Sequence, residues 1–274
     1  LKSTRPTAVN LSWAVDLIIN KLDNIKDNDR SKYLLNLANQ MRQDDIKVCN
    51  EIGENGFKLI ESIYNKKRST VNILTHCNAG WLATVDWGTA LSPIFKAKQK
   101  NIPIHVWVDE TRPRNQGFNL TAWELLNENI PNSLIVDNVG GHLMQKGLVD
   151  ICITGTDRTS LNGDVCNKIG TYLKALAAYD NNIPFYVAAP ISSIDFNINN
   201  GLRDIPIEER DADEVSSMYG SDNEGIIRKI NIIPNDAQCK NYAFDVTPSK
   251  YITKIITEKK NVNANIDSIL SLKN

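Results

Sequence analysis

Five short apolar runs, each ending at a polar or glycine-containing turn, constrain the fold of this chain more than any other feature. The runs are NILTHC (72–77), IHVWVD (104–109), SLIVDN (133–138), VDICITGTD (149–157) and PFYVAAP (184–190). Segments with helical spacing of apolar residues lie among them, at 119–129, 139–147 and 165–180. Continuous apolar strands that alternate with helices predict a parallel sheet covered on both faces. We therefore predict an α/β fold built on a Rossmann-like parallel sheet.

The first 64 residues follow a different pattern. Apolar residues recur at helical spacing from about residue 5 to 64, first in an amphipathic segment over 6–22. The basic, polar stretch 64–70 separates this block from the apolar runs. We predict a smaller, mainly helical N-terminal domain over 1–64 and a Rossmann-like catalytic domain over 65–274. Because residue 1 is Leu and the helical pattern starts almost at once, we expect the first domain to be the remnant of a truncated one.

Two predictions concern the last quarter of the chain. Residues 218–225 (MYGSDNEG) have the composition of a mobile loop. Thr247 and Pro248 resemble a helix N-cap followed by proline at the first helical position. We therefore predict a last helix over 248–259.

Charge and composition argue against several classes of function. With 31 basic and 32 acidic residues among 274, the net charge of −1 gives no reason to expect a nucleic-acid or membrane partner. No run approaches membrane-spanning length and no signal-peptide pattern opens the chain, so we expect a cytoplasmic protein, or a nuclear one in a eukaryote. The five cysteines form no CxxC pair, which predicts reduced thiols. Without metal-ligand spacing, or GxGxxG after a predicted strand, we expect neither a metal nor a nicotinamide or flavin cofactor.

Cys77 and Asp157 stand where two of the apolar runs end. Strand ends of an open α/β sheet deliver side chains to the crevice in which ligands bind. The two residues are therefore our candidate catalytic pair. The alternative is structural: free cysteines are commonly just buried, and a carboxylate in a turn commonly caps a helix or a loop.

A series of longer motifs carries a resemblance to a known family. The motifs are RPTAVNL (5–11), HCNAG (76–80), DETRP (109–113) followed by QG, LTAWEL (120–125), NGDVCNKIGTY (162–172), IPFYVAAP (183–190) and FDVTP (244–248). In these motifs and in their order, over nearly its whole length, the chain resembles the methylthioribose-1-phosphate isomerases. The related regulatory subunits of the exchange factor for translation initiation share that fold but, as a group, lack the reactive Cys and Asp.

The resemblance implies an aldose-to-ketose isomerisation in methionine salvage, from 5-methylthioribose 1-phosphate to 5-methylthioribulose 1-phosphate. Since phosphate on the anomeric oxygen locks the sugar ring, an acid is required at the ring oxygen, and the resemblance gives this role to Asp157. A carboxyl can supply that proton near neutral pH only if burial raises its pKa. Cys77 is implied either as the base that moves hydrogen from C2 to C1 or, for a hydride shift, as part of the wall that excludes water.

Four further positions match residues that bind substrate in the family: Arg5, Gln116, Asn167 and Lys168. Phosphate needs cationic donors and backbone amides, which such a set can supply. Their structural alternatives are a frayed terminus, a loop amide, a capping side chain and a solvated helix lysine, respectively. The resemblance also implies a small-molecule sugar phosphate as substrate, a homodimer, and an upstream segment with an Arg-Gly-Ala-Pro motif.

Two other functions stay open at this point. One is the sister isomerase of ribose 1,5-bisphosphate, which shares the Cys and Asp but needs a second cationic site. The other is a non-catalytic regulatory protein of the exchange-factor type, against which the retention of Cys77, Asp157, Asn167 and Lys168 argues. We interpret the acidic cluster of Glu208, Glu209 and Asp211 as a solvated loop and not as a border of the site.

Overall fold

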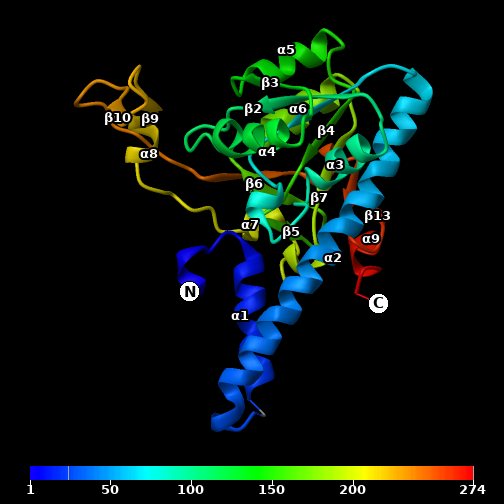
Figure 1. The fold of residues 1–274 in the computed structure, drawn as a ribbon, viewed down its shortest axis with the longest axis vertical. Coiled ribbons are helices and arrows are strands. Elements are labelled where there is room, and N and C mark those ends of the chain that lie inside the picture. The colour runs from blue at the N-terminus through cyan, green and yellow to red at the C-terminus, as the bar shows by residue number, and fades with distance from the viewer. Residues whose placement is uncertain (24, 274) are drawn as a thin grey trace.

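The computed structural model describes residues 1–23 and 25–273, with a long helical extension below the β-sheets (Figure 1). The extension pairs α1 (Val9–Leu22) with α2 (Asp27–Lys67), whose 41 residues span about 60 Å at 1.5 Å per residue. Both helices confirm the helical pattern predicted for this part of the sequence. α2 ends where Arg68 takes a left-handed φ of 54° and donates its N–H to the Tyr64 carbonyl.

The two halves of α2 have different surroundings. Its buried residues lie between Cys49 and Ile60, where the helix packs on α3 (Ser92–Gln99) and on the sheet. The first half carries exposed and half-buried side chains. The division of the chain into two domains near residue 65 stays a prediction.

Seven strands of the described part of the chain form the main sheet, in the order β13-β12-β7-β4-β1-β2-β3. The neighbours from β12 to β3 are parallel, and β13 runs antiparallel to β12. The bounds are β1 Val71–Thr75, β2 Ile104–Asp109, β3 Asn132–Ile135, β4 Ile151–Thr154, β7 Phe185–Ala188, β12 Lys254–Ile256 and β13 Asn261–Val262. Because the five predicted strands are β1, β2, β3, β4 and β7, the predicted parallel sheet is confirmed.

Alternation along the strands fills two cores, one on each face of the sheet. The neighbours Ile73 and Leu74 of β1 point to opposite faces and belong to different clusters. α2 and α3 cover the face of Ile73. Three helices cover the other face: α5 (Val139–Gln145), α6 (Thr171–Asp180) and α9 (Ile266–Leu270).

A second sheet has the order β11-β6-β5-β8 and corrects one prediction. Its bounds are β5 Arg158–Ser160, β6 Val165–Lys168, β8 Ile194–Asp195 and β11 Phe244–Thr247. The helix predicted over 165–180 is wrong for its first residues, because β6 pairs antiparallel with both β5 and β11. The helix starts at Thr171, after Gly170 turns the chain with a φ of 101°.

The last quarter of the chain corrects two more predictions. The helix predicted over 248–259 is wrong: a single 3₁₀ turn (η5, Ser249–Tyr251) is followed by β12, in a segment rich in the β-branched residues that favour strands. Residues 218–225 are not simply a loop, because β9 (Ser217–Ser221) forms an antiparallel hairpin with β10 (Ile227–Asn231). This hairpin projects away from the main sheet at the upper left of Figure 1.

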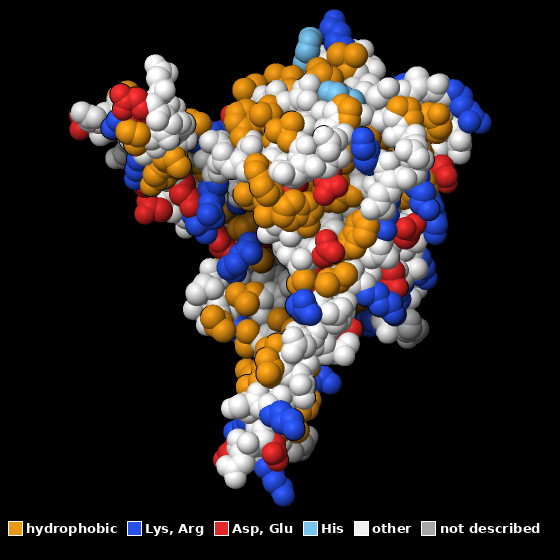
Figure 2. Space-filling view, viewed as in Figure 1, with side chains coloured by type: hydrophobic (Ala, Val, Ile, Leu, Met, Phe, Trp, Pro, Cys, Tyr) orange, Lys and Arg blue, Asp and Glu red, His pale blue; other side chains and the backbone are white. Residues whose placement is uncertain are grey.

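Short elements connect the rest. They are η1 Lys2–Thr4, η2 Trp81–Ala83, the π-helical turn η3 Gly117–Thr121, α4 Ala122–Asn127, η4 Ile191–Ser193, α7 Gly201–Asp204 and α8 Asp213–Ser216. Hydrophobic side chains gather over α4 on the face drawn in Figure 2, where Trp123 and Leu126 are 49% and 66% exposed. Within residues 1–23 and 25–273, no helix is both long enough and apolar enough to span a bilayer.

The strand order places a topological switch at the centre of the main sheet. The chain moves outward from β1 to β2 and β3 and then returns to the other side of β1 as β4. Connections from the ends of β1 and β4 thus leave in opposite directions, and a crevice opens between them, where open α/β sheets bind ligands. Cys77 follows β1 and Asp157 follows β4, so both lie at this crevice.

Candidate functional site

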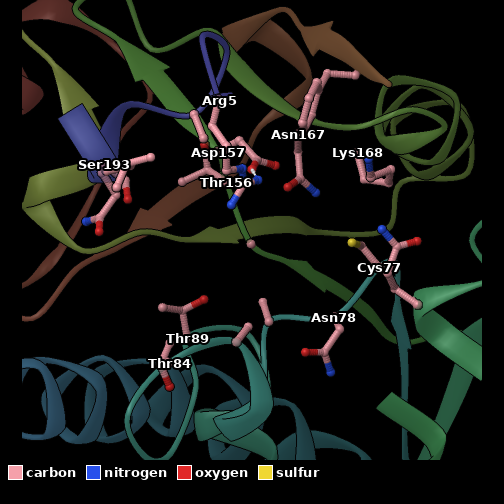
Figure 3. Close-up of a pocket in the computed structure, with 18 of the residues that line it drawn as sticks. Arg5, Cys77, Asn78, Thr84, Thr89, Thr156, Asp157, Asn167, Lys168 and Ser193 are labelled. Carbon is pink, nitrogen blue, oxygen red and sulfur yellow. Dashed lines mark hydrogen bonds and ion pairs between the residues drawn. The ribbon is translucent and has the colours of Figure 1, made fainter. Parts of the chain in front are cut away.

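A cavity of about 700 Å³ lies at the switch point. Its lining includes all six residues singled out from the sequence: Arg5, Cys77, Gln116, Asp157, Asn167 and Lys168. Figure 3 shows Arg5 beside Asp157 on one side and Cys77 with Lys168 on another, with the Asn167 amide directed between them. The structure therefore brings together residues from the N-terminal segment, two strand ends, a loop and the second sheet.

Side chains on both sides hold the backbone of Cys77. The residue has a φ of 68°, which is uncommon for anything but glycine. Its N–H donates to Thr111 Oγ1 at 2.8 Å, and its carbonyl accepts from Thr121 Oγ1 at 2.6 Å. Such backbone strain persists only where the surroundings over-determine it, and here they direct the thiol into the cavity.

His76 does not activate the neighbouring thiol. Its Nδ1 lies 2.8 Å from Asp109 Oδ2, and its Nε2 lies 2.8 Å from the Ile169 carbonyl oxygen. Both ring nitrogens are therefore engaged away from Cys77.

A buried carboxylate fixes the loop that follows Cys77. Glu124 of α4 is fully buried and accepts hydrogen bonds from Trp81 N, Leu82 N and Asn78 Nδ2, at 2.8, 3.2 and 2.9 Å. Burial raises the pKa of this carboxyl, while the three donors lower it. The loop is thus tied to a helix that packs into the core on one face of the main sheet.

Cys77 is a neutral thiol in this cavity at physiological pH. Burial, with the nearby charge of Asp157, raises its pKa to about 11, and Lys168 opposes this shift. At pH 7 only about 10⁻⁴ of such a thiol is thiolate. The resting site therefore offers an apolar, weakly hydrated sulfur and not a preformed anion.

This protonation state predicts slow alkylation of Cys77 with a steep pH dependence. Since the thiolate is the reactive form, the rate with iodoacetamide is expected to rise about tenfold for each pH unit from 7 to 10. Mass spectrometry of the Cys77 peptide measures the alkylation rate. Alkylation of Cys239, which lies outside the cavity, is measured in the same digest and shows that active reagent was present. A rate for Cys77 that is already flat above pH 8 contradicts the raised pKa.

Asp157 brings a largely buried carboxyl to the cavity. Its side chain keeps 19% exposure, and Arg5 Nη2 lies 3.2 Å from its Oδ1. Burial raises the pKa of Asp157, Arg5 and Lys168 lower it, and Glu208 raises it further, with a net upward shift. The adjacent Arg158 points away and bonds to Thr7 O and Asp195, so its charge does not oppose this shift.

Lys168 lies on β6, and not on the predicted helix, and is buried. Its Nζ lies 4.3 Å from the centre of the Phe244 ring and makes no hydrogen bond or ion pair with any residue that the structure describes. Burial lowers the pKa of Lys168, with help from Arg210 and Arg114, while Cys77 and Asp157 oppose the shift. An unpaired buried ammonium of this kind is a natural partner for an anionic ligand.

Two amides complete the predicted set. Asn167 donates from Nδ2 to Thr171 Oγ1 at 3.0 Å, so its side chain is held beside Lys168 on the same strand. Gln116 precedes the π-helical turn η3, and its Oε1 is buried without a hydrogen-bond partner among the described residues. A buried polar atom left open at a cavity is costly unless a ligand or a water satisfies it.

Among the charged residues of the cavity, Arg114 and Arg210 were not singled out from the sequence, and Glu208 was assigned to a solvated loop. Glu208, Arg210 and Arg114 all line the cavity, and their charges affect Asp157 or Lys168. The interpretation of Glu208 as part of a solvated loop is wrong, since its side chain is only 9% exposed. The available signal for Glu208 and Arg210 was IPIEER (205–210), in which three charged residues directly follow an apolar stretch.

One cluster has the geometry of a metal site. Ligand atoms of His76, Asp109 and Asp137 lie within 4.8 Å of one another. The Lys174 ammonium already occupies this position, 3.0 Å from Asp109 Oδ2 and bonded to the Asp137 carbonyl. The cluster thus carries its own cation, from a side chain of α6.

The comparison with known proteins places this site in a family. The family model described as the initiation factor 2 subunit family matches residues 1–263. The chain belongs to this family. Within it, the chain is 58% identical over 261 residues to the methylthioribose-1-phosphate isomerase of Escherichia coli O45:K1, covering 94% of this chain and 70% of the relative. It is 52% identical over 273 residues to the isomerase of Sulfurimonas denitrificans, covering 98% and 75%.

Solved structures agree with the family and with the fold. The crystal structure of 5-methylthioribose 1-phosphate isomerase from Pyrococcus horikoshii OT3 superposes with a TM-score of 0.84 at 38% identity, over 100% of this chain and 72% of that one. The delta subunit of translation initiation factor eIF-2B from A. fulgidus gives 0.78 at 37% identity, over 98% and 75%. Both neighbours confirm the mixed α/β fold with a mostly parallel sheet and a helical N-terminal region.

Proposed function

We propose that this protein isomerises 5-methylthioribose 1-phosphate to 5-methylthioribulose 1-phosphate in methionine salvage. The observation that carries the proposal is the meeting of Asp157, Cys77 and the unpaired Lys168 in one cavity at the switch point. The names of relatives at 51–58% identity support the same reaction. The site offers an acid that can open the locked ring, a neutral thiol, and in Lys168 a cation without an ion-pair partner among the described residues, which can bind phosphate.

Asp157 begins the reaction as the proton donor. Its raised pKa keeps the carboxyl protonated closer to neutral pH than an exposed aspartate. The proton passes to the ring oxygen, the bond from that oxygen to C1 breaks, and positive charge develops at C1. Hydrogen then moves from C2 to C1 with its bonding electrons, and the C2 hydroxyl becomes the ketone. The hydroxyl proton returns, directly or through water, to the Asp157 carboxylate, which restores the acid.

Cys77 adjoins the carbon atoms between which this hydrogen moves. A thiol with a pKa of about 11 is rarely a base in the resting site, so we assign it to the wall that keeps water from C1. A neutral sulfur at this position binds water only weakly. Unlike a thiolate, it also does not form a bond to the cation at C1.

The remaining residues hold the two ends of the substrate. Lys168 receives the phosphate with Arg114 and Arg210 nearby, and Gln116 and Asn167 supply amides to oxygen atoms of the sugar. The methylthio end has an apolar lining, to which α1 and η2 contribute Leu11, Ala14, Leu82 and Ala83.

A homodimer and a cytoplasmic location belong to the same proposal. The exposed apolar side chains of α4, Trp123 and Leu126, favour self-association. The five cysteines are free, which favours a compartment that keeps thiols reduced.

Direct assay of two substrates tests the function. The protein, expressed from its complete reading frame, is given 5-methylthioribose 1-phosphate and ribose 1,5-bisphosphate separately, and phosphorus NMR follows the ketose phosphate. We expect product from the thio-sugar, with a preference over the bisphosphate of at least about 10²-fold in kcat/KM, since a second phosphate meets the apolar lining. If only the bisphosphate gives a ketose, the protein is a ribose 1,5-bisphosphate isomerase and the proposed substrate is wrong. No product from either, with the protein folded, contradicts an enzymatic role.

A further inference from the structure

We propose that Glu208 is a positioning residue of this isomerisation, which locks a strap of residues 5–9 against the segment of the acid and places a negative charge in the same cavity. The proposal rests on the proposed function for its kinetic consequences. Glu208 comes from the IPIEER motif, which no predicted role had absorbed. Its carboxylate and that of Asp157 line the same cavity.

The strap crosses the site between two anchors. On one side, Thr7 N donates to Glu208 Oε1 at 3.1 Å, and Glu208 N donates to Thr7 Oγ1 at 3.2 Å. Thr7 Oγ1 also donates to the Pro206 carbonyl at 2.8 Å. Thr7 is fully buried as a result.

The second anchor is the segment that carries the acid itself. Val9 N donates to the Asp157 carbonyl at 3.1 Å, and Arg158 donates to the carbonyls of Pro6 and Thr7 at 2.9 and 2.8 Å. Arg5, which reaches Asp157, stands at the start of this strap and is itself 53% exposed. The Glu208 clasp therefore fixes the segment from which Arg5 reaches the carboxyl of Asp157.

The charge of Glu208 has a separate effect. The charged and titratable groups that face Asp157 come from the strap, from β6, from the end of β1 and from the loop after α7; they are Arg5, Lys168, Cys166, Cys77 and Glu208. Arg5 and Lys168 favour the ionised acid, whereas Glu208 favours the protonated form that the reaction needs. Arg210 Nη1 lies 3.8 Å from Glu208 Oε2, and this ion pair helps to hold the carboxylate in its position.

Glu208→Gln separates the charge from the clasp. The amide oxygen can still accept from Thr7 N, but the negative charge is gone. We expect the alkaline limb of the kcat profile to move to lower pH, with kcat at pH 8 about tenfold below wild type and KM little changed. Glu208→Ala, which also removes the acceptor, is expected to raise KM as well.

Glu209→Gln is the matched control. It makes the same chemical change one residue along, where the side chain is 44% exposed and pairs with Lys240 at 2.7 Å. Its pH profile is expected to superpose on wild type. A Glu208→Gln profile that also superposes on wild type, or one that matches a shift in Glu209→Gln, overturns the proposal.

A readout without turnover keeps this test independent of the proposed function. Carbon-13 NMR of aspartate carboxyls follows the titration of Asp157 in the substrate-free protein, with Asp157→Asn for assignment. The midpoint is expected at lower pH in Glu208→Gln than in wild type, even if the enzyme acts on another sugar phosphate. An unmoved midpoint refutes the role of the charge, whereas absent turnover with a moved midpoint counts against the substrate alone.

Discussion

Asp157→Asn is expected to lower kcat by about 10³-fold or more while substrate still binds. The amide is nearly isosteric with the carboxyl and can still accept a hydrogen bond from Arg5, 3.2 Å away, but it has no proton to give to the ring oxygen. Single-turnover rates measure the chemical step, and titration calorimetry with the substrate measures binding. The control is Asp204→Asn, since Asp204 lies outside the cavity and pairs with Arg203 at the surface.

Asp157→Asn is expected to lower kcat but to maintain or raise the stability of the fold at alkaline pH. A carboxyl whose pKa is raised on folding contributes stability at low pH that is lost as pH rises through the folded pKa. Ionised Asp157 is therefore a cost at pH 8, and Asp157→Asn is expected to melt at or above the wild-type temperature there. A variant that keeps kcat, or one that loses both binding and stability, contradicts Asp157 as the proton donor.

The predictable part of the fold is the part in which local pattern and tertiary structure agree. β1, β2 and β4 are continuous apolar runs because helices cover both faces of their sheet, so each run signals a buried parallel strand. The sequence predicts a helix over β6 because Val165, Ile169 and Leu173 recur at helical spacing and continue into the true helix. Pairing with β11, about 80 residues away, decides its conformation, and a local pattern carries no trace of that partner.

The candidate site divides in the same way. The meeting of Cys77 and Asp157 could be predicted from the sequence, because strand ends meet at one edge of a parallel sheet. The burial of Glu208 could not be predicted, because its contact with Thr7 joins residues 201 positions apart and its burial comes from the strap. In a bare sequence, a glutamate in an acidic stretch is better interpreted as solvated. The distinction needed the structure.

Cys77→Ser is expected to lower kcat by about 10²-fold, with a smaller change in KM. Serine keeps the backbone bonds to Thr111 and Thr121 but replaces a weakly hydrated sulfur with a hydroxyl that binds water. Water at this wall competes for the cation that develops at C1, so fewer openings of the ring lead to ketose. Rates for the variant are compared with Cys239→Ser, whose thiol lies outside the cavity.

Isotope exchange separates the wall from a base for the same residue. In heavy water, a hydride shift carries the C2 hydrogen to C1 without deuterium, whereas removal and return of a proton introduces deuterium at C1. Because the Cys77 pKa of about 11 makes thiolate rare, we expect no deuterium at C1 and expect Cys77→Ala to retain more activity than Cys77→Ser. If wild-type product carries one deuterium at C1 and both variants are inactive, Cys77 is the base. Wild-type kcat in Cys77→Ser removes the thiol from the reaction altogether.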